Sequence, residues 1–328
     1  MRNLLPALAL FLSVSACGVF GGPSREERDR LNFFKQNAGA YFLSDSYEQA
    51  LDMARRGLQI EPEDYELLIT SGLCHLQKAA GNTRDLEEAE RFLKRAFDQR
   101  SFEENRPEAI LGYATVEQRL GIDHDRRARL LTAELARPDL QEGDRLTKDA
   151  QAKSHAERAK LYWGEARRAL QVLLQRQEML RFAHKGLMEI AVEFNDYDTA
   201  VKEGLACLAE NKKAQDRVND VIKETPVASE EIRARSTLQE LLDQEKRVRA
   251  SLAEMHFRTK HFKESVEQLD VLLQLDPTRT EDYYNRAVAL ENLGATEGAR
   301  RDFEKFLANT SLPQSNDRVV HAQRSTGR

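Results

Sequence analysis

The stretch that decides the fold is TEDYYNRAVALENLGATEGARRDFEKFLANTSL, residues 280–312. Small residues occupy its eighth and twentieth positions, Ala287 and Ala299, and Gly294 stands between them at the fifteenth. Apolar residues such as Phe303 recur at helical spacing on both sides of the glycine, which predicts two amphipathic helices joined by a tight turn. Because only small side chains allow two helices to approach closely, we expect the pair to cross at Ala287 and Ala299.

The same spacing recurs toward the amino terminus. The segment FRTKHFKESVEQLDVLLQLDP, residues 257–277, repeats the offsets of apolar residues and proline found in AYFLSDSYEQALDMARRGLQIEP, residues 40–62. One pair of helices cannot bury its apolar face alone, whereas stacked pairs can. The sequence therefore predicts an all-α chain of stacked pairs. Counting from the prolines and small residues places the units near these starts: Leu31, Tyr65, Pro107, Thr147, Arg181, Lys246 and Thr280.

These units resemble tetratricopeptide repeats, in which a proline at position 32 follows the second helix, as at Pro62, Pro138 and Pro277. The resemblance implies a tetratricopeptide-type α-solenoid, a right-handed superhelix of about six to seven helix pairs. The unit near 147 departs from the pattern, with Ser154 at position 8 and Glu157 at position 11. Two interpretations stay open for it, a true repeat or one long helix pair.

The repeats divide the chain into an amino-terminal solenoid, residues 31–215, and a carboxy-terminal pair of units, residues 246–312. About thirty extra residues, 216–245, separate them, and Pro226 interrupts this segment. We expect a helical joint there, with a short helix, a loop and then a helix that runs into the sixth unit. The tail, residues 313–328, is polar and lacks periodicity, so we expect it to be disordered.

The first residues, MRNLLPALALFLSVSAC, are typical of a bacterial export signal, with a basic start and a short apolar segment. Val14 to Cys17 resembles the lipobox of bacterial lipoproteins, which implies a signal peptide over residues 1–16. It also implies a diacylglyceryl group on the Cys17 thiol and an acyl chain such as palmitate on the new amino terminus. Residues 17–30 would form the lipidated tether and the start of the first helix. Ordinary secretory cleavage at the same bond, or an uncleaved anchor, remain alternatives.

The residue after the cysteine indicates which membrane the lipid would occupy. In lipoproteins an aspartate at that position is the usual inner-membrane retention residue, and here it is Gly18. The resemblance therefore implies anchoring at the periplasmic face of the outer membrane. Beyond residue 16 no stretch approaches the ~18 apolar residues that a transmembrane helix needs.

Composition and motifs argue against several function classes. Lys and Arg (50) nearly balance Asp and Glu (55) in the 328 residues, so a nucleic-acid-binding surface is not expected. No P-loop, nucleophile-elbow, zinc-protease or CxxC motif occurs, so the sequence predicts no enzyme, cofactor or metal site. Asp123-His124-Asp125 is expected in the turn of the third unit, with aspartate as a helix cap. Cys74 and Cys207 are expected to be buried free thiols.

The sequence therefore predicts that function depends on a groove that binds a partner. In this repeat family the first helix of each unit lines the concave face with positions 2, 5, 9, 12 and 13. In the first two units this implies a groove that includes the residues Lys35, Phe42, Ile69, Leu73 and Leu76. Some relatives bind a chaperone's C-terminal peptide with Lys at 5 and Asn at 9. Lys35 fits that clamp and Gly39 does not, so this ligand is disfavoured.

The sequence thus predicts a non-catalytic interaction scaffold, anchored by lipid in the cell envelope, that binds an envelope protein or peptide along its groove. The architecture looks like the tetratricopeptide lipoproteins that help assemble type IV pilus secretins or outer-membrane proteins. A periplasmic carrier that holds a peptide, glycan fragment or lipid in an enclosed groove is the alternative. A pocket lined continuously by apolar residues of the first helices would favour the carrier.

Overall fold

The computed structural model describes residues 23–80, 82–224 and 227–327, and within these ranges every regular element is helical. The expected signal peptide, Cys17 and most of the expected tether lie outside the described residues. None of the described helices is both long enough and apolar enough to cross a membrane. The elements are α1 (Arg25–Leu43), α2 (Tyr47–Ile60), α3 (Tyr65–Lys78), α4 (Thr83–Phe97), η1 (Phe102–Glu104), α5 (Pro107–Leu135), α6 (Glu142–Gln175), α7 (Leu180–Glu193), α8 (Tyr197–Glu224), α9 (Ala228–Arg258), α10 (Phe262–Leu275), α11 (Thr280–Asn292), α12 (Thr296–Asn309) and α13 (Asp317–Thr326).

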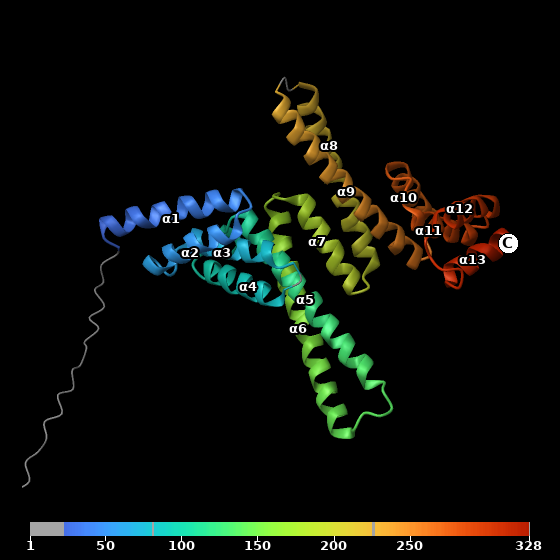
Figure 1. Ribbon diagram of the computed structural model, residues 1–328, viewed down its shortest axis with the longest axis horizontal. Coiled ribbons are helices and arrows are strands. Elements are labelled where there is room, and N and C mark those ends of the chain that lie inside the picture. Colours follow the sequence, from blue (N-terminus) through green and yellow to red (C-terminus); the bar gives the residue numbers. More distant parts are fainter. Residues whose placement is uncertain (1–22, 81, 225–226, 328) are drawn as a thin grey trace, which may run out of the picture.

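The helices form a row of antiparallel pairs (Figure 1). Each odd-numbered helix from α1 to α11, here called helix A, packs on the even-numbered helix that follows it, here called helix B. Each helix B also packs on the next helix A, and this links the pairs into one stack. The predicted fold class, an all-α solenoid of helix pairs, is confirmed.

Helix A ends in the same way in four of the pairs. The residue at position 15 of the unit adopts a left-handed backbone, with φ of 57° at Asp45, 55° at Asn195, 64° at Lys260 and 73° at Gly294. A single residue in this conformation stops a helix and lets the chain reverse at once. Helix B therefore begins within a few residues and lies antiparallel to helix A.

The small residues that the repeat pattern predicts at the crossing of A and B are buried. Ala38, Ala50 and Ala287 have no exposed surface, and Ala299 is 2% exposed. At Gly72 even a methyl group would lie 2.6 Å from Leu93 of helix B. Close packing at these positions is what holds each pair together.

The units predicted near 107 and 147 form a single long pair, so of the two interpretations left open for the unit near 147 the long helix pair is the one observed. Helix α5 spans 29 residues and α6 spans 34. The turn expected at Asp123-His124-Asp125 lies inside α5, where the aspartates cap nothing. Alanines of α6, including Ala159 and Ala166, are buried between the two helices. Because they let α5 and α6 stay close, α5 continues to Leu135 and α6 begins at Glu142, on either side of Pro138 at the tip.

The segment predicted as a joint, residues 216–245, also differs from expectation. Its first part is no separate short helix, because α8 continues without a break to Glu224. Its second part belongs to α9, which runs into the sixth unit as predicted. The insertion therefore lengthens a helix B and the next helix A into a second projecting hairpin, α8/α9, which points away from α5/α6 (Figure 1).

The carboxy-terminal tail is helical over Asp317–Thr326, so the prediction that residues 313–328 are disordered is wrong for this part of the tail. Helix α13 starts at the cap Asn316, whose side chain accepts a hydrogen bond from the Arg318 backbone. Its Val319 is 1% exposed and packs with Phe306 of α12, which is fully buried. A terminal repeat must cover its outer apolar face, and α13 supplies that cover.

Candidate functional site

Two of the five predicted groove residues belong to the core. Ile69 is 4% exposed and Leu76 is 6% exposed, and both pack in the central hydrophobic cluster. The prediction that they line a partner groove is therefore wrong. The cause is the close packing of consecutive A helices, since α3 contacts both α1 and α5.

The other three predicted residues contact neighbours within the chain. Lys35 Nζ lies 3.1 Å from Asp64 and 3.0 Å from Glu66, so it ties α1 to α3. Burial lowers the pKa of Lys35, but hydrogen bonds to the two carboxylates raise it overall. The Phe42 ring lies 6.0 Å from that of Tyr47. Leu73 is half-buried on α3. Their role in partner binding stays a prediction.

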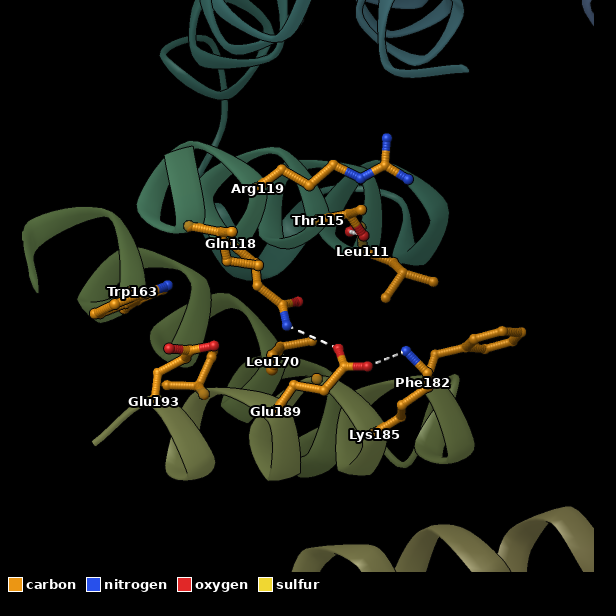
Figure 2. A pocket seen from close by; sticks show the side chains of 13 residues that line it. Leu111, Thr115, Gln118, Arg119, Trp163, Leu170, Phe182, Lys185, Glu189 and Glu193 are labelled. Carbon is orange, nitrogen blue, oxygen red and sulfur yellow. Dashed lines mark hydrogen bonds and ion pairs between the residues drawn. The ribbon is translucent and has the colours of Figure 1, made fainter. Parts of the chain in front are cut away.

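An open cavity lies further along the A helices, between α5 and α7 and above α6. We call it the central pocket; its volume is about 380 Å³ (Figure 2). Figure 2 shows side chains from all three helices turned toward the same space. Its lining residues are Leu111, Thr115, Gln118, Arg119, Ile122, Trp163, Leu170, Phe182, Lys185, Gly186, Glu189, Ile190 and Glu193.

A chain of polar groups crosses the central pocket. Gln118 Nε2 on α5 donates a hydrogen bond of 2.8 Å to Glu189 on α7, and Glu189 also pairs with Lys185 (Figure 2). At one end, Glu193 lies 3.4 Å from Arg129. Burial raises the pKa of Glu193, and Arg129 acts in the opposite direction. These groups join the two A helices and offer partly exposed donors and acceptors.

Most of the other lining residues are apolar. Trp163 is 4% exposed, and its indole N–H has no hydrogen-bond partner among the described residues. It packs so tightly on Gly121 that a side chain there would meet the ring at 2.5 Å. At the rim, Phe182 is 40% exposed and Ile122 is 39% exposed. The pocket therefore combines exposed apolar side chains with polar ones, as sites for peptide segments do.

The family's groove rule, applied to other units, would have found this pocket. Positions 5, 9, 12 and 13 of the unit starting at Pro107 are Leu111, Thr115, Gln118 and Arg119. The same rule applied to the unit starting at Arg181 gives Phe182, Lys185, Glu189 and Glu193 at positions 2, 5, 9 and 13. All eight line the pocket. The sequence signal was present, but the prediction named residues of the first two units.

A second cavity of about 470 Å³ lies on the same side of the carboxy-terminal pairs, between α9, α10, α11 and α13. Groove positions again contribute, including Glu254 and Phe257 on α9 and Tyr284 on α11. Arg318 of α13 closes one end and pairs with Glu281. The A-helix side of the stack thus carries more than one opening.

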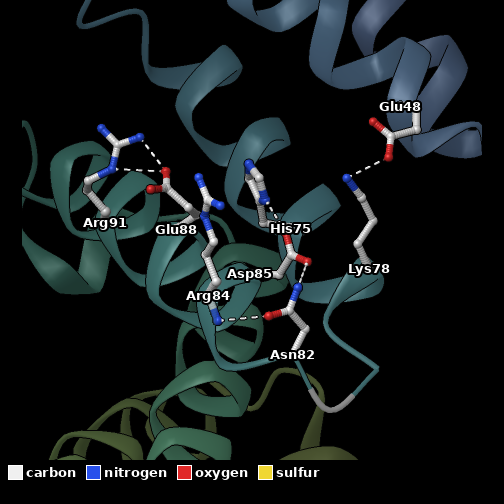
Figure 3. A network of polar contacts seen from close by, with 8 residues as sticks. All are labelled: Glu48, His75, Lys78, Asn82, Arg84, Asp85, Glu88 and Arg91. Atoms are coloured by element: carbon white, nitrogen blue, oxygen red, sulfur yellow. Dashed lines mark hydrogen bonds and ion pairs between the residues drawn. The ribbon is translucent and has the colours of Figure 1, made fainter.

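A third cavity of about 620 Å³ lies between α2, α3 and α4, and Figure 3 shows polar contacts beside it. Lys78 pairs with Glu48 at 2.6 Å, and His75 Nδ1 lies 2.9 Å from Asp85 (Figure 3). The His75 ring also stacks on Phe92, with centroids 5.7 Å apart. Because these polar groups are already paired within the chain, they are less available to a ligand.

The described residues provide little for catalysis. Residues 23–80, 82–224 and 227–327 contain no group of three or more His, Cys, Asp or Glu side chains that could hold a metal. Cys74 and Cys207 are buried free thiols, as predicted. Burial raises the pKa of Cys74 to about 12 and that of Cys207 to about 11. Since the thiolate is the reactive form, both thiols are unreactive near neutral pH.

Comparison with known families agrees with this geometry at the carboxy-terminal end. Residues 252–325, from the end of α9 into α13, match the family described as Tetratricopeptide repeat. The fold and this match define the class: an all-α solenoid of helix pairs whose carboxy-terminal part is similar to tetratricopeptide repeats. No curated protein matches the sequence.

Solved structures resemble the chain at low identity. A tetratricopeptide repeat protein from Parabacteroides merdae is 12% identical, with a TM-score of 0.36, over 92% of this chain and 100% of that one. The TPR2AB domain of yeast Sti1, in a complex with pHSP90, is 12% identical, with a TM-score of 0.30, over 92% and 100%. Yeast Tom70 is 11% identical, with a TM-score of 0.23, over 92% and 90%.

Proposed function

We propose that this protein is a non-catalytic scaffold that binds a partner protein or peptide along the A-helix side of its solenoid. The central pocket carries the proposal, because it places a half-exposed aromatic ring, Phe182, beside the polar chain of Gln118, Glu189 and Lys185. An extended segment could bury an apolar side chain against the ring and exchange hydrogen bonds with the polar groups. The repeat match over residues 252–325 supports the same use of the stack.

We further propose that lipid on Cys17 anchors this scaffold in the bacterial outer membrane, facing the periplasm. The support is the sequence Val14 to Cys17 and the glycine that follows it. One acyl chain binds a membrane only weakly, whereas two or three hold a protein firmly. Such a scaffold suits the assembly of an envelope complex, for example a pilus secretin or the outer-membrane machinery.

The geometry gives the carrier alternative no added support. A carrier for a lipid or glycan fragment would need a continuous apolar lining in an enclosed groove. In the central pocket, Arg119, Lys185 and Glu189 interrupt the apolar surface. The open, mixed lining fits a protein segment better than an apolar ligand.

Site-specific photocrosslinking tests the binding surface. Benzoylphenylalanine at Phe182 should capture a discrete partner in cells, and Lys185→Glu should reduce that capture. Benzoylphenylalanine at Leu205, which is 47% exposed on α8 outside the pocket, is the matched control. Equal capture from both positions, or none from Phe182, would contradict the proposed surface.

Membrane fractionation tests the anchor separately. Cys17→Ser should move the protein from the membrane to the soluble periplasmic fraction. The Ala16-Cys17 bond can also be a site for ordinary secretory cleavage, so mass spectrometry of the wild-type amino terminus must show the lipid. An unmodified wild-type cysteine would overturn the anchor and leave the binding surface untouched.

A further inference from the structure

The α5/α6 pair projects beyond the neighbouring helices as an arm, here defined as residues 124–155 (Figure 1). Very little apolar burial holds this arm closed, since between residues 125 and 154 only Ala128 and Ala152 are buried. At the tip, Lys148 pairs with Glu134, and Arg145 donates a hydrogen bond of 3.2 Å to the Leu135 carbonyl. The contacts at the base of the arm therefore decide whether its two helices stay together.

A pair of histidines lies at that base, one on each helix. His124 Nδ1 lies 2.7 Å from His155 Nδ1, and His124 is only 8% exposed. The Tyr162 ring stacks on His124 with centroids 5.3 Å apart and planes 18° apart. At this distance one Nδ1 must donate a hydrogen bond and the other must accept it, so at least one ring nitrogen must be unprotonated.

Proton counting shows when this contact fails. In the neutral pair one ring donates to the other. After one proton is added, the imidazolium still donates to its neutral neighbour, and the bond survives. After the second proton both Nδ1 atoms carry hydrogen, so no acceptor remains and two positive rings face each other. The contact therefore breaks at the second proton, and the pH at which this happens is a property of the pair rather than of either histidine alone.

The surrounding charges add to this repulsion. Burial is the largest of the causes that lower the pKa of His124. Its neighbours His155, Arg127 and Arg158 lower this pKa further, whereas Asp123 raises it. From α4, Glu90 and Lys94 act on Tyr162. From α7, Glu193 reaches Arg129 on the arm. Asp123, which also pairs with Arg127 at 2.8 Å, thus acts on His124 against the arginines and the neighbouring ring.

We propose that His124 and His155 form an acid-operated joint at the base of the arm, where α5 and α6 separate once both rings are protonated. The joint lies beside the central pocket, because His124 is one helical turn beyond Gly121, on which the pocket residue Trp163 packs. Acidification would therefore loosen one wall of that pocket. This regulation goes beyond the proposed binding function, and its test needs no partner.

Trp163 is the single tryptophan of the sequence, so its fluorescence reports on the base of the arm. In the full-length protein in detergent, lowering the pH from about 7.5 to about 5 should shift the emission to the red as water reaches the ring. His124→Gln and His155→Gln, which keep a polar side chain but do not titrate, should each abolish the shift. His184→Gln is the matched control, since His184 pairs with Glu203 between α7 and α8, away from the arm.

Amide hydrogen exchange gives a second readout. After correction for the intrinsic effect of pH, acid should speed exchange in residues 124–155 by roughly tenfold or more, and not in the carboxy-terminal pairs. Circular dichroism must show that each variant keeps its helices, and His155→Gln is the milder change because His155 is partly exposed. A red shift that persists in both arm variants, or arm exchange that does not change with pH, would overturn the proposal.

Discussion

Position 15 of the repeat has a different backbone conformation in the carboxy-terminal pairs than in the central α5/α6 pair. In α9 and α11, position 15 is Lys260 or Gly294, and its left-handed backbone ends helix A. In α5 the equivalent residue is Gly121, which stays helical and receives the Trp163 ring from α6. A glycine at this position therefore does not by itself end a helix. When a large side chain of helix B packs on it, the glycine serves as a contact surface and helix A continues.

The two regions also differ in what they bury. The carboxy-terminal core contains Phe303 and Phe306, both fully buried. The central core contains Trp163 and many alanines, and it also encloses Glu117, which is 1% exposed. Both cores bury ionisable groups, but Asp302 of the carboxy-terminal core is paired with Arg286 at 2.7 Å, whereas burial raises the pKa of Glu117 in the central core.

The largest expected effect separates the two regions directly. Phe306→Ala should lower the free energy of unfolding by about 3–5 kcal/mol, because it removes a fully buried aromatic ring. In a solenoid each unit interacts only with its neighbours, so the loss should concentrate in α11 to α13. Urea unfolding followed by circular dichroism should gain an early phase, while Trp163 fluorescence should keep its midpoint. Phe33→Ala, at a ring that is 57% exposed, is the control. If the fluorescence midpoint moves equally, the two regions unfold as one unit.

The next effect concerns pH in the central region. Burial raises the pKa of Glu117 to about 8, while nearby Lys94 lowers it. The folded state thus keeps a proton that the unfolded chain loses near its ordinary pKa of about 4.3. This stabilising contribution is fully present below about pH 4 and is lost as the pH rises toward 8. Glu117→Gln should remove that loss. At about pH 8 its free energy of unfolding should exceed that of the wild type by on the order of 3 kcal/mol.

Denaturant unfolding at several pH values measures this difference. Glu254→Gln is the matched control, because the Glu254 side chain is 63% exposed and pairs only at the surface with Arg258. The free energy of unfolding of this control should equal that of the wild type at every pH. Wild-type and Glu117→Gln curves that stay parallel from pH about 4 to 8 would show that Glu117 is ionised in the folded protein.

The repeat pattern predicted the helix pairs because it depends on contacts between helix A and helix B of the same pair. Ala38 and Ala287 must be small wherever helices A and B cross, so their positions identify a pair without knowledge of its neighbours. The fusion of two predicted units into α5/α6 depends on Trp163 packing on Gly121, more than forty residues away in sequence. No periodicity within one unit contains that contact.

The candidate site was less predictable for the same reason. Whether a groove position is open depends on which residues the next helix A places beside it, as Gly112 of α5 lies beside Leu73 and Leu76. Leu76 and Gln118 both occupy position 12 of their units, yet Leu76 is buried and Gln118 lines the central pocket. The sequence of the tail also gives only a weak indication of a helix. Few apolar residues, such as Val319, occur in the helix that covers the last unit.

A matched pair of glycine substitutions sharpens the comparison further. Gly121→Ala would place a methyl group 2.5 Å from the rigid Trp163 ring, and such overpacking should cost about 1–3 kcal/mol. At Gly298 the nearest atom lies 3.3 Å away, at the flexible end of Leu290. Gly298→Ala should therefore be neutral or gain up to about 1 kcal/mol from helix propensity. Thermal unfolding of both variants measures the contrast, and equal effects would mean that Trp163 does not restrain α5.

The smallest effect concerns the helix that covers the last unit. Asn316→Ala removes the side-chain oxygen that accepts a 3.0 Å hydrogen bond from the Arg318 backbone, and should cost about 1 kcal/mol. Asn316→Asp keeps an acceptor at the cap and should restore the stability. Because α13 covers Phe306, fraying of its first turn should also speed amide exchange in α12, while exchange in α5 and α6 stays the same. A disordered tail would show no response to either substitution, so the experiment separates a helical cover from the unstructured end that the composition favours.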